Sequence, residues 1–402
     1  MDALNFFLAD VRGGLGAFVG VFLVTAAAWT PGQVGTVLAL SGLLGIMFHA
    51  PVGAMIDAVR DKRLLLVGGV VLLAECALAI ERHPTRPVVF AADTVMAILG
   101  GVFAPAVAAL SLGLVPERLL PSRLARNAAW DRIGNLVIAA AIGAIGWWWS
   151  QGTTFYLIPV LAAVSAWIAL TIPKQAIDHE RARGFAPGQT HAEPQRFWGL
   201  FLENRAFLVL ALIAAAFHFA NTSMLPLIGQ KLALSHPGLE TALLSACILV
   251  AQAVAVPVAI FAGRKATAWG PVALLAAACL ALASRGLLFA RFNDASVLIG
   301  AQVLDGVATG LWDVLVPLIL GSVISGSGRY SMGRGVLGTV QGIGGSLSYA
   351  CSGALVMIGG FGLAFAALAT FAVVAFALAA LFLVPGVIGV TLTSQEEGIG
   401  TG

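Results

Sequence analysis

The stretch GAMIDAVRDKR, residues 53–63, lies between two long apolar runs. The runs before and after it, residues 33–56 and 64–80, are each long enough to cross a lipid bilayer as a helix. Backbone groups in lipid must form hydrogen bonds within their own segment, which an α-helix achieves. The stretch therefore predicts a short basic turn that joins two membrane-spanning helices.

The composition places the whole chain in a membrane. Hydrophobic residues make up 59% of the 402 residues, charged residues only 10%, and the mean hydropathy is +0.96. Soluble domains carry about 25% charged residues, so this chain cannot cover a water-exposed surface. Its 47 glycines suit close packing of helices in lipid. The four cysteines all lie in apolar runs, where small packing residues are expected rather than disulfides or metal ligands.

Twelve apolar runs of spanning length follow one another, and we predict a helix for each: 5–29, 33–56, 64–80, 88–113, 125–148, 153–172, 205–230, 239–263, 271–290, 295–322, 333–358 and 361–388. A long polar interruption divides them into two sets of six. The sequence thus predicts an all-α membrane protein with two pseudo-symmetric six-helix bundles. In chain order, the expected parts are an N-terminal bundle 1–172, a cytoplasmic linker 173–204, a C-terminal bundle 205–390 and a cytoplasmic tail 391–402.

Basic residues are unevenly distributed between the two membrane surfaces. They concentrate in the even-numbered connections, whereas the odd-numbered connections hold only four: Arg82, Arg86, Lys231 and Arg291. By the positive-inside rule, the even-numbered connections and both termini are expected in the cytoplasm. The first apolar run has no basic region before it and continues for a full span, so it is expected as a retained helix. The predicted location is the cytoplasmic, or inner, membrane.

An internal repeat supports the division into halves, because the second helix ends in APVGAMID (50–57) and the eighth in VPVAIFAG (256–263). Twelve helices in a 6+6 arrangement with a cytoplasmic linker resemble the major facilitator superfamily of secondary transporters. The superfamily motif in the connection between helices 2 and 3 is a glycine, three residues, an aspartate and a basic turn, which Gly53, Asp57 and the residues after them match in kind.

The resemblance implies that this connection holds one conformational state and does not bind substrate. The residues expected in that role are Gly53, Asp57, Arg60 and Arg63. The alternative is that the positive charge serves only to orient the chain in the membrane.

The resemblance also implies that helices 1, 4, 7 and 10 line a central cavity. Polar residues gather on these helices, and ionisable groups within a membrane mark substrate or proton pathways. The predicted pathway residues, with one addition from helix 11, are Asp10, Arg12, Asp93, His218, Asn221, Gln302, Asp305, Asp313 and Gln341. Asp305 and His218 are expected near the midplane, where removal from water favours a neutral carboxyl and makes Asp305 the foremost proton site. The alternatives are a fixed pairing for Asp305 and a packing role for His218.

Further charges lie on neighbouring helices. Asp131 and Arg132 on helix 5 share the depth of Asp10 and Arg12, so we predict one charged cluster that forms a gate or, alternatively, a static salt-bridge network. Arg285 on helix 9 lies off the cavity helices and is expected to extend outward to the membrane surface.

These features favour a proton-coupled secondary transporter that moves a small organic or amphiphilic solute by alternating access, with export preferred. The alternatives are proton-symport uptake of a nutrient or metal chelate, and a membrane receptor or channel. The sequence holds no GxxxxGK[ST] loop, no HExxH motif and no catalytic triad pattern, so ATP-driven transport and enzyme activity are not expected. The expected partners are the solute, protons and the bilayer; no cofactor, metal or nucleic acid is expected, and the protein is expected to be a monomer.

Overall fold

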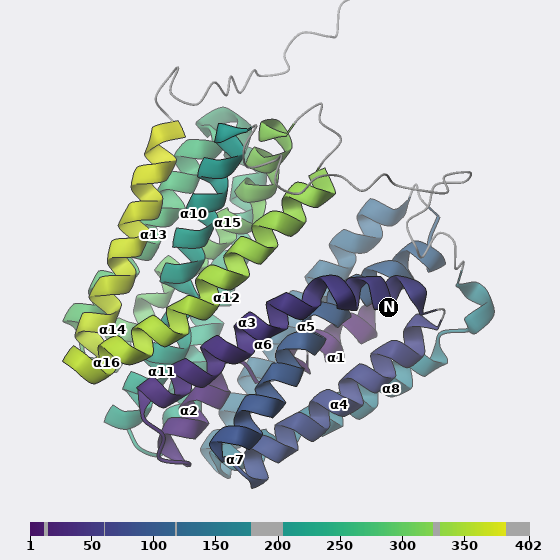
Figure 1. Cartoon of the computed structure of the whole chain (residues 1–402), viewed down its shortest axis with the longest axis horizontal. Helices are drawn as coiled ribbons and strands as arrows, with labels where there is room; N and C mark the ends of the chain where they lie inside the picture. The colour runs from purple at the N-terminus through teal and green to yellow at the C-terminus, as the bar shows by residue number, and fades with distance from the viewer. Residues whose placement is uncertain (12–14, 60, 117–118, 178–203, 325–329, 383–402) are drawn as a thin grey trace, which may run out of the picture.

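The fold is known from a computed structural model, which describes residues 1–11, 15–59, 61–116, 119–177, 204–324 and 330–382. Within these ranges the chain is helical and has no strand, which confirms the predicted class. Figure 1 shows two groups of helices side by side, purple to blue at the right and teal through green to yellow at the left. We call them the N-half and the C-half.

The N-half runs from α1 to α8. Its elements are α1 (Asp2–Val11), α2 (Ala17–Thr25), α3 (Pro31–Ala58), α4 (Lys62–Arg82), α5 (Arg86–Leu114), α6 (Leu120–Trp148), α7 (Gln151–Thr154) and α8 (Leu157–Thr171), and a short 3-10 helix, η2 (Lys174–Ala176), follows. The C-half contains α10 (Arg205–Asn221), α11 (Met224–Ser235), α12 (Glu240–Trp269), α13 (Pro271–Arg291), α14 (Ala295–Gly300), α15 (Gln302–Val323) and α16 (Tyr330–Phe382).

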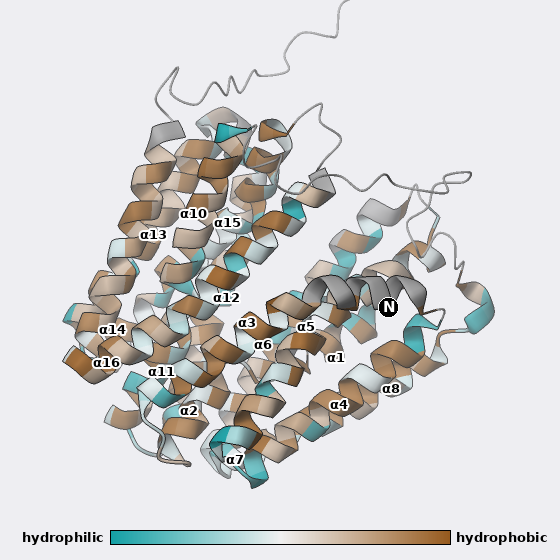
Figure 2. Ribbon diagram, in the orientation of Figure 1, coloured by the Kyte–Doolittle hydropathy of each residue, from teal (hydrophilic) through white to brown (hydrophobic). Residues whose placement is uncertain are grey.

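The described residues hold ten helical stretches long and apolar enough to cross a membrane. One of them is α16, which bends where Gly359 and Gly360 leave helical geometry, Gly360 with a φ of 76°. The two arms of α16 are the predicted eleventh and twelfth helices, and α1 with α2 covers the predicted first. Figure 2 shows apolar residues along the lengths of the helices. The expected linker stays a prediction, since residues 178–203 lie outside the described ranges.

Three of the predicted cavity helices are interrupted. The first is divided between α1 and α2, the seventh between α10 and α11, and the tenth at Ala301 between α14 and α15. Leu15, just before α2, has a φ of 68°, a conformation that is costly for a residue with a side chain. Leu15 is only 1% exposed, and irregular backbone at membrane depth is tolerated where protein covers it.

The ends of the helices define two sides of the molecule. We call the side with Arg63, Lys174 and Arg205 the basic end, and the side with α7 and the start of α12 the far end. The expected placement of the basic end in the cytoplasm remains a prediction. Each half has its own apolar core, and of the buried core residues that the structure describes in the N-half cluster, only Ala233 and Leu244 come from the C-half.

In the described structure the halves meet mainly along three helix pairs: α3 with α16, α6 with α12, and α2 with α11. Glycines make the closest approaches, and they lie toward the far end. A methyl group on Gly35 of α3 would clash with the carbonyl oxygen of Tyr349 and lie 3.2 Å from the Cα of Gly353, both on α16. A methyl group on Gly146 of α6 would clash with Thr241 of α12. We call the contact of α3 with α16 the far seam.

Gly35→Ala is expected to destabilise the protein in this closed form by about 1–3 kcal/mol, the usual cost of overpacking, because backbone on α16 cannot move aside locally. The measurement is thermal unfolding of the purified protein. Gly68→Ala is the matched control, since a methyl group on Gly68 of α4 meets nothing within 4 Å. Equal unfolding temperatures for the two variants would contradict the tight seam.

At the basic end, the connection between α3 and α4 is bound to the end of α8. Asp61 caps α4 by accepting hydrogen bonds from the backbone of Arg63 and Leu64, and its carboxylate pairs with Arg63 at 3.0 Å and Lys174 at 3.3 Å. The Arg63 guanidinium also donates to the carbonyl of Ile172 beyond α8. The hydrogen bond from Arg63, with the Leu64 amide and Lys174, lowers the pKa of Asp61 to about 2.

The lowered pKa predicts an acid-sensitive contribution to stability. Because the folded pKa lies below the ordinary value of 3.8, the contribution is complete above that value and is lost as the pH falls through about 2. Asp61→Asn keeps a capping side chain but not the charge, so the stability difference between wild type and variant should shrink across this range. Thermal unfolding at a series of pH values measures it, and a constant difference would refute the charge effect.

Candidate functional site

A buried cluster of polar side chains lies inside the C-half, centred on Arg285 of α13. Arg285 is 0% exposed. Its Nη1 donates to Oδ1 of Asp305 on α15 at 2.7 Å and to Oδ1 of Asn221 on α10 at 2.8 Å. A buried charge is tolerated only when it is paired and hydrogen-bonded, so this guanidinium ties three helices together.

The expectation that Arg285 extends to the membrane surface is wrong. Its side chain turns inward because α13 packs on α15, which presents the Asp305 carboxylate at the same depth. A signal was present in the sequence: an arginine within a span requires a counter-ion, and Asp305 is an acid within the next span. The sequence does not say which faces of the two helices meet.

The cluster has polar atoms without partners. In the part of the chain that the structure describes, Nε and Nη2 of Arg285 and both amide atoms of Gln302 are buried and form no hydrogen bond. Gln302 lies one turn before Asp305 on α15, so it faces the same side. Unpaired buried groups of this kind usually bind ordered water or a ligand, and the cluster therefore has free hydrogen-bonding capacity.

His218 is near this cluster but packs against aromatic rings. The ring of Phe217 stacks on Trp312 of α15 with centroids 3.9 Å apart, and His218 meets the edge of Trp312 at 5.3 Å. The His218 Nε2 is buried with no hydrogen-bond partner among the described residues. These contacts fix α10 against α15, so the predicted seventh and tenth helices are joined at mid-depth.

A second ion pair joins the two halves. Arg132 of α6 pairs with Asp313 of α15, and the two side chains are 37% and 46% exposed. At 1.5 Å per residue, Arg132 lies about 18 Å and Asp313 about 15 Å from the basic-end termini of their helices. A charged pair at this depth is too costly to face lipid, so its exposed surface belongs to the space between the halves.

The other predicted residues are placed only in part. Asp131 and Gln341 are half-buried on α6 and α16. Arg12 and Arg60 lie outside the described residues, as do the side chains of Asp10, Gly53 and Asp57, whose backbones lie in α1 and α3. The charged cluster thus remains a prediction for its four members, Asp10, Arg12, Asp131 and Arg132. The partner that the structure gives to Arg132 is Asp313.

Lys231 was expected in a connection but lies in α11, 9% exposed. Its ammonium group donates to the carbonyl oxygens of Phe289 at 2.9 Å and Phe292 at 2.7 Å, at the end of α13. A cation at a helix C-terminus is stabilised by the carbonyls left unpaired there. Lys231 thereby fastens α11 to α13 beyond the interruption between α10 and α11.

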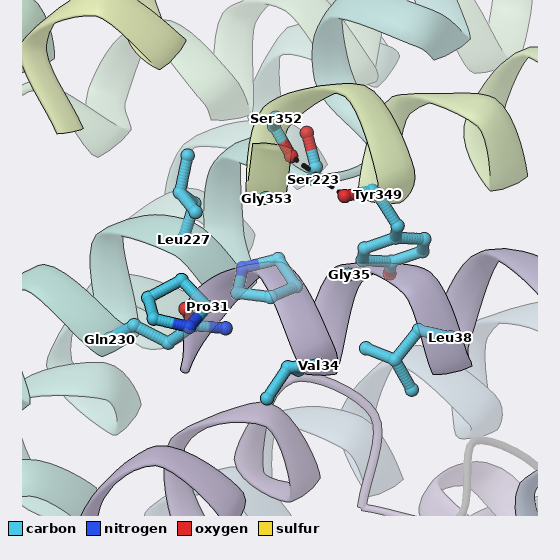
Figure 3. Close-up of a pocket in the computed structure, with 11 residues that line it drawn as sticks. Pro31, Val34, Gly35, Leu38, Ser223, Leu227, Gln230, Tyr349, Ser352 and Gly353 are labelled. Atoms are coloured by element: carbon cyan, nitrogen blue, oxygen red, sulfur yellow. Dashed lines mark hydrogen bonds between the residues drawn. The ribbon is translucent and has the colours of Figure 1, made fainter. Parts of the chain in front are cut away.

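The far end is closed between the halves. A small pocket lies there between α3, α11 and α16 (Figure 3). Its volume is about 10 Å³. Such a volume is near the smallest that holds one water molecule. Gln230 lines it with its amide oxygen buried and unpaired in the described structure. No organic solute fits here, so a solute cannot pass the far seam in this conformation.

A larger crevice of about 430 Å³ lies on the C-half alone. Its lining comes from α10 and α16, and every lining residue is apolar, including Leu212, Phe219 and Phe371. It has no polar group to orient a solute and no residue from the N-half. It is therefore a poor candidate for a site that both halves must reach.

Arg285→Met is expected to destabilise the protein by about 3–5 kcal/mol, because it leaves the Asp305 carboxylate buried without a cation. The double variant Arg285→Met with Asp305→Leu should regain most of that stability, since neither charge is then buried. Thermal unfolding of both variants is the measurement. A double variant no more stable than Arg285→Met would show that the ion pair is not what the cluster depends on.

Comparison with known proteins adds an independent line of evidence. A family model described as Major Facilitator Superfamily matches residues 3–348. Two curated relatives, both named as uncharacterized MFS-type transporters of Mycobacterium tuberculosis (strains CDC 1551 and H37Rv), are each 37% identical over 380 residues, covering 94% of this chain and 91% of the relative.

Solved structures share the fold at low sequence identity. A mutant of the nucleoside transporter NupG superposes with a TM-score of 0.79 at 16% identity, covering 95% of this chain and 98% of that one. A bacterial homologue of the human lysosomal transporter Spinster gives a TM-score of 0.72 at 14% identity and 94% coverage of each chain. A POT family transporter in complex with a conjugated peptide gives 0.73 at 12% identity and 96% coverage of each.

Proposed function

The chain belongs to the Major Facilitator Superfamily and is a membrane transporter, not an enzyme, and from this premise we propose that it couples the movement of a small organic or amphiphilic solute to protons. The proposed direction is export across the inner membrane, with both termini in the cytoplasm and the protein acting as a monomer.

The observation that carries this proposal is the buried pair of Asp305 and Arg285, hydrogen-bonded to Asn221. A transporter can couple to protons when a carboxylate pairs with a cation in one conformation and binds a proton in another. Arg285 lies on α13, Asp305 on α15 and Asn221 on α10, which is one arm of an interrupted helix. Motion of these helices therefore changes the distance between the two charges. The unpaired amide of Gln302 supplies a hydrogen-bonding group beside it.

The proposed solute site is the space around Arg132 and Asp313. This pair has one residue from each half, so rocking of the halves about the midplane must make and break it. One acid and one base offer contacts to a solute that carries both polar and charged groups.

A second candidate function is uptake by proton symport. Nucleosides are one solute class to test for it, because NupG, which shares the fold, is named as a nucleoside transporter. The two functions use the same residues and differ in the sign of the coupled proton movement.

The test is proton movement in proteoliposomes under an imposed pH gradient, with a panel of nucleosides, organic amines and carboxylic acids added outside. Wild type should show solute-dependent proton flux, and Asp305→Asn should lose it. The asparagine oxygen still accepts from Arg285, but the buried Arg285 charge then lacks an anion, so thermal unfolding of the variant is measured first. Asp305→Glu, which keeps the charge, should retain the flux. Asp294→Asn is the matched control: Asp294 caps α14 on the surface through backbone amides that asparagine also bonds.

The outcomes separate the alternatives. Protons moving opposite to the solute indicate antiport, and protons moving with it indicate symport. Unchanged coupling in Asp305→Asn removes Asp305 from the mechanism. Solute flux without proton movement in wild type refutes proton coupling.

A further inference from the structure

We propose that the apolar crevice on the C-half binds an acyl chain of an anionic phospholipid, whose phosphate group pairs with Arg205 at the basic end. The crevice has a volume of about 430 Å³ and is lined by α10 and both arms of α16. This lipid would sit on the outside of the transporter, so the inference goes beyond the proposed function and does not depend on it.

The crevice opens away from the N-half. On the first arm of α16, Gly342 and Gly353 make close approaches to α3. The crevice residues of the same arm include Val340, Gly344 and Leu347, which lie on the opposite side of the helix at about 3.6 residues per turn. Figure 1 shows the second arm of α16, in yellow, at the outer edge of the C-half. The crevice therefore faces the bilayer.

The shape of the crevice suits a chain that runs along the helices. The lining residues fall within the ranges 212–219, 340–347 and 371–378, each of which covers about 10 Å of helix length. At the inner ends of two of these ranges, the rings of Phe219 and Phe371 pack together with centroids 4.1 Å apart. The other ends of the ranges lie toward the basic end. An acyl chain in the leaflet at the basic end has this direction.

The floor and walls of the crevice are apolar. At the floor, a methyl group on Gly344 would lie 2.6 Å from the carbonyl oxygen of Ala215, so the backbones of α16 and α10 are in close contact there. The walls include large apolar side chains that the protein leaves 39–47% exposed: Leu212, Ile343, Leu347, Phe371 and Val374. A hydrocarbon chain needs only dispersion contacts, which these walls supply, whereas a polar solute would find no side chain to bind.

A basic side chain continues the crevice toward the membrane surface. Arg205 is the first residue of α10, and it shares one face of that helix with Leu208, Leu212 and Phe219 at spacings of three, four and seven residues. Arg205 lies about 10 Å beyond Leu212, at the level of a lipid head group. Its side chain is exposed and has no ion-pair partner among the described residues.

The charge around Arg205 favours an anionic head group over a zwitterionic one. Among the described residues at the basic end of the C-half there is no acid to bind a choline or ethanolamine group. The exposed charged residues described there are all basic: Arg205, Arg264, Lys265 and Arg334. A phosphate can pair with a guanidinium through two parallel hydrogen bonds. Chain and head group are therefore recognised by different parts of one surface.

The first test measures binding of the acyl chain. Native mass spectrometry of the purified protein in detergent is used to titrate phosphatidylglycerol and phosphatidylcholine that carry identical chains. Wild type should bind one phosphatidylglycerol about fivefold more tightly than phosphatidylcholine, the usual effect of one arginine on an anionic lipid. Val374→Trp places a ring in the crevice and should lose the tight binding. Leu280→Trp is the matched control, because Leu280 is also exposed but lies on α13, outside the crevice.

The second test measures recognition of the head group. Arg205→Gln should bind the two lipids with equal affinity, because the amide has no charge. Arg264→Gln removes an exposed arginine from the same end, on α12, and should keep the fivefold preference. Glycerol phosphate, which has the phosphate but no chain, should not displace the bound lipid.

Three results would overturn the proposal. They are equal lipid binding by Val374→Trp and Leu280→Trp, an unchanged preference in Arg205→Gln, and displacement of the lipid by glycerol phosphate, which would indicate a phosphate site without a chain. None of these measurements involves solute or proton flux. A protein that binds the lipid as described but moves no protons with any solute would refute the proposed coupling and leave the lipid site standing.

Discussion

The constraint on which the structure depends is that polar groups at membrane depth must find partners within the protein. Water is absent from the bilayer core, so each buried charge and each interrupted helix has to be satisfied by a neighbouring segment. Arg285 meets Asp305 and Asn221, and Lys231 meets the last carbonyls of α13. These contacts decide which helix faces meet inside the C-half, where apolar surface alone is nearly uniform around each helix.

The same constraint is met differently inside the C-half and at the interface between the two halves. Within the C-half, charges are paired and covered, and the pairing holds three helices in register. Between the halves, the far end is joined by glycine contacts, and mid-depth is bridged by the exposed pair of Arg132 and Asp313. Close-packed glycines leave no room for a solute. In an exposed ion pair, by contrast, each charged side chain can release the other and bind a solute instead. The chain thus has a tight closure and an adaptable contact at different depths of one interface.

The helices and the polar residues within them were predictable from the sequence. The partners of those polar residues were not, for a physical reason. Composition and run length identified the helices, because the bilayer fixes their length. The acids and His218 were visible as polar residues in apolar runs. The partners were not, since pairing depends on rotation of each helix about its axis: Arg285 was expected to point outward, and Lys231 was expected in a connection.

The separate apolar cores of the two halves have a consequence for how the chain is made. Almost all fully buried residues of the N-half core come from the N-half itself, so that half can bury its apolar surface before α10 has left the ribosome. The far seam then forms as a late docking step between two packed bodies, with glycine surfaces that need no rearrangement of side chains. Assembly and the working cycle would share this interface, so that the last contact to form in biogenesis is the one that opens during transport.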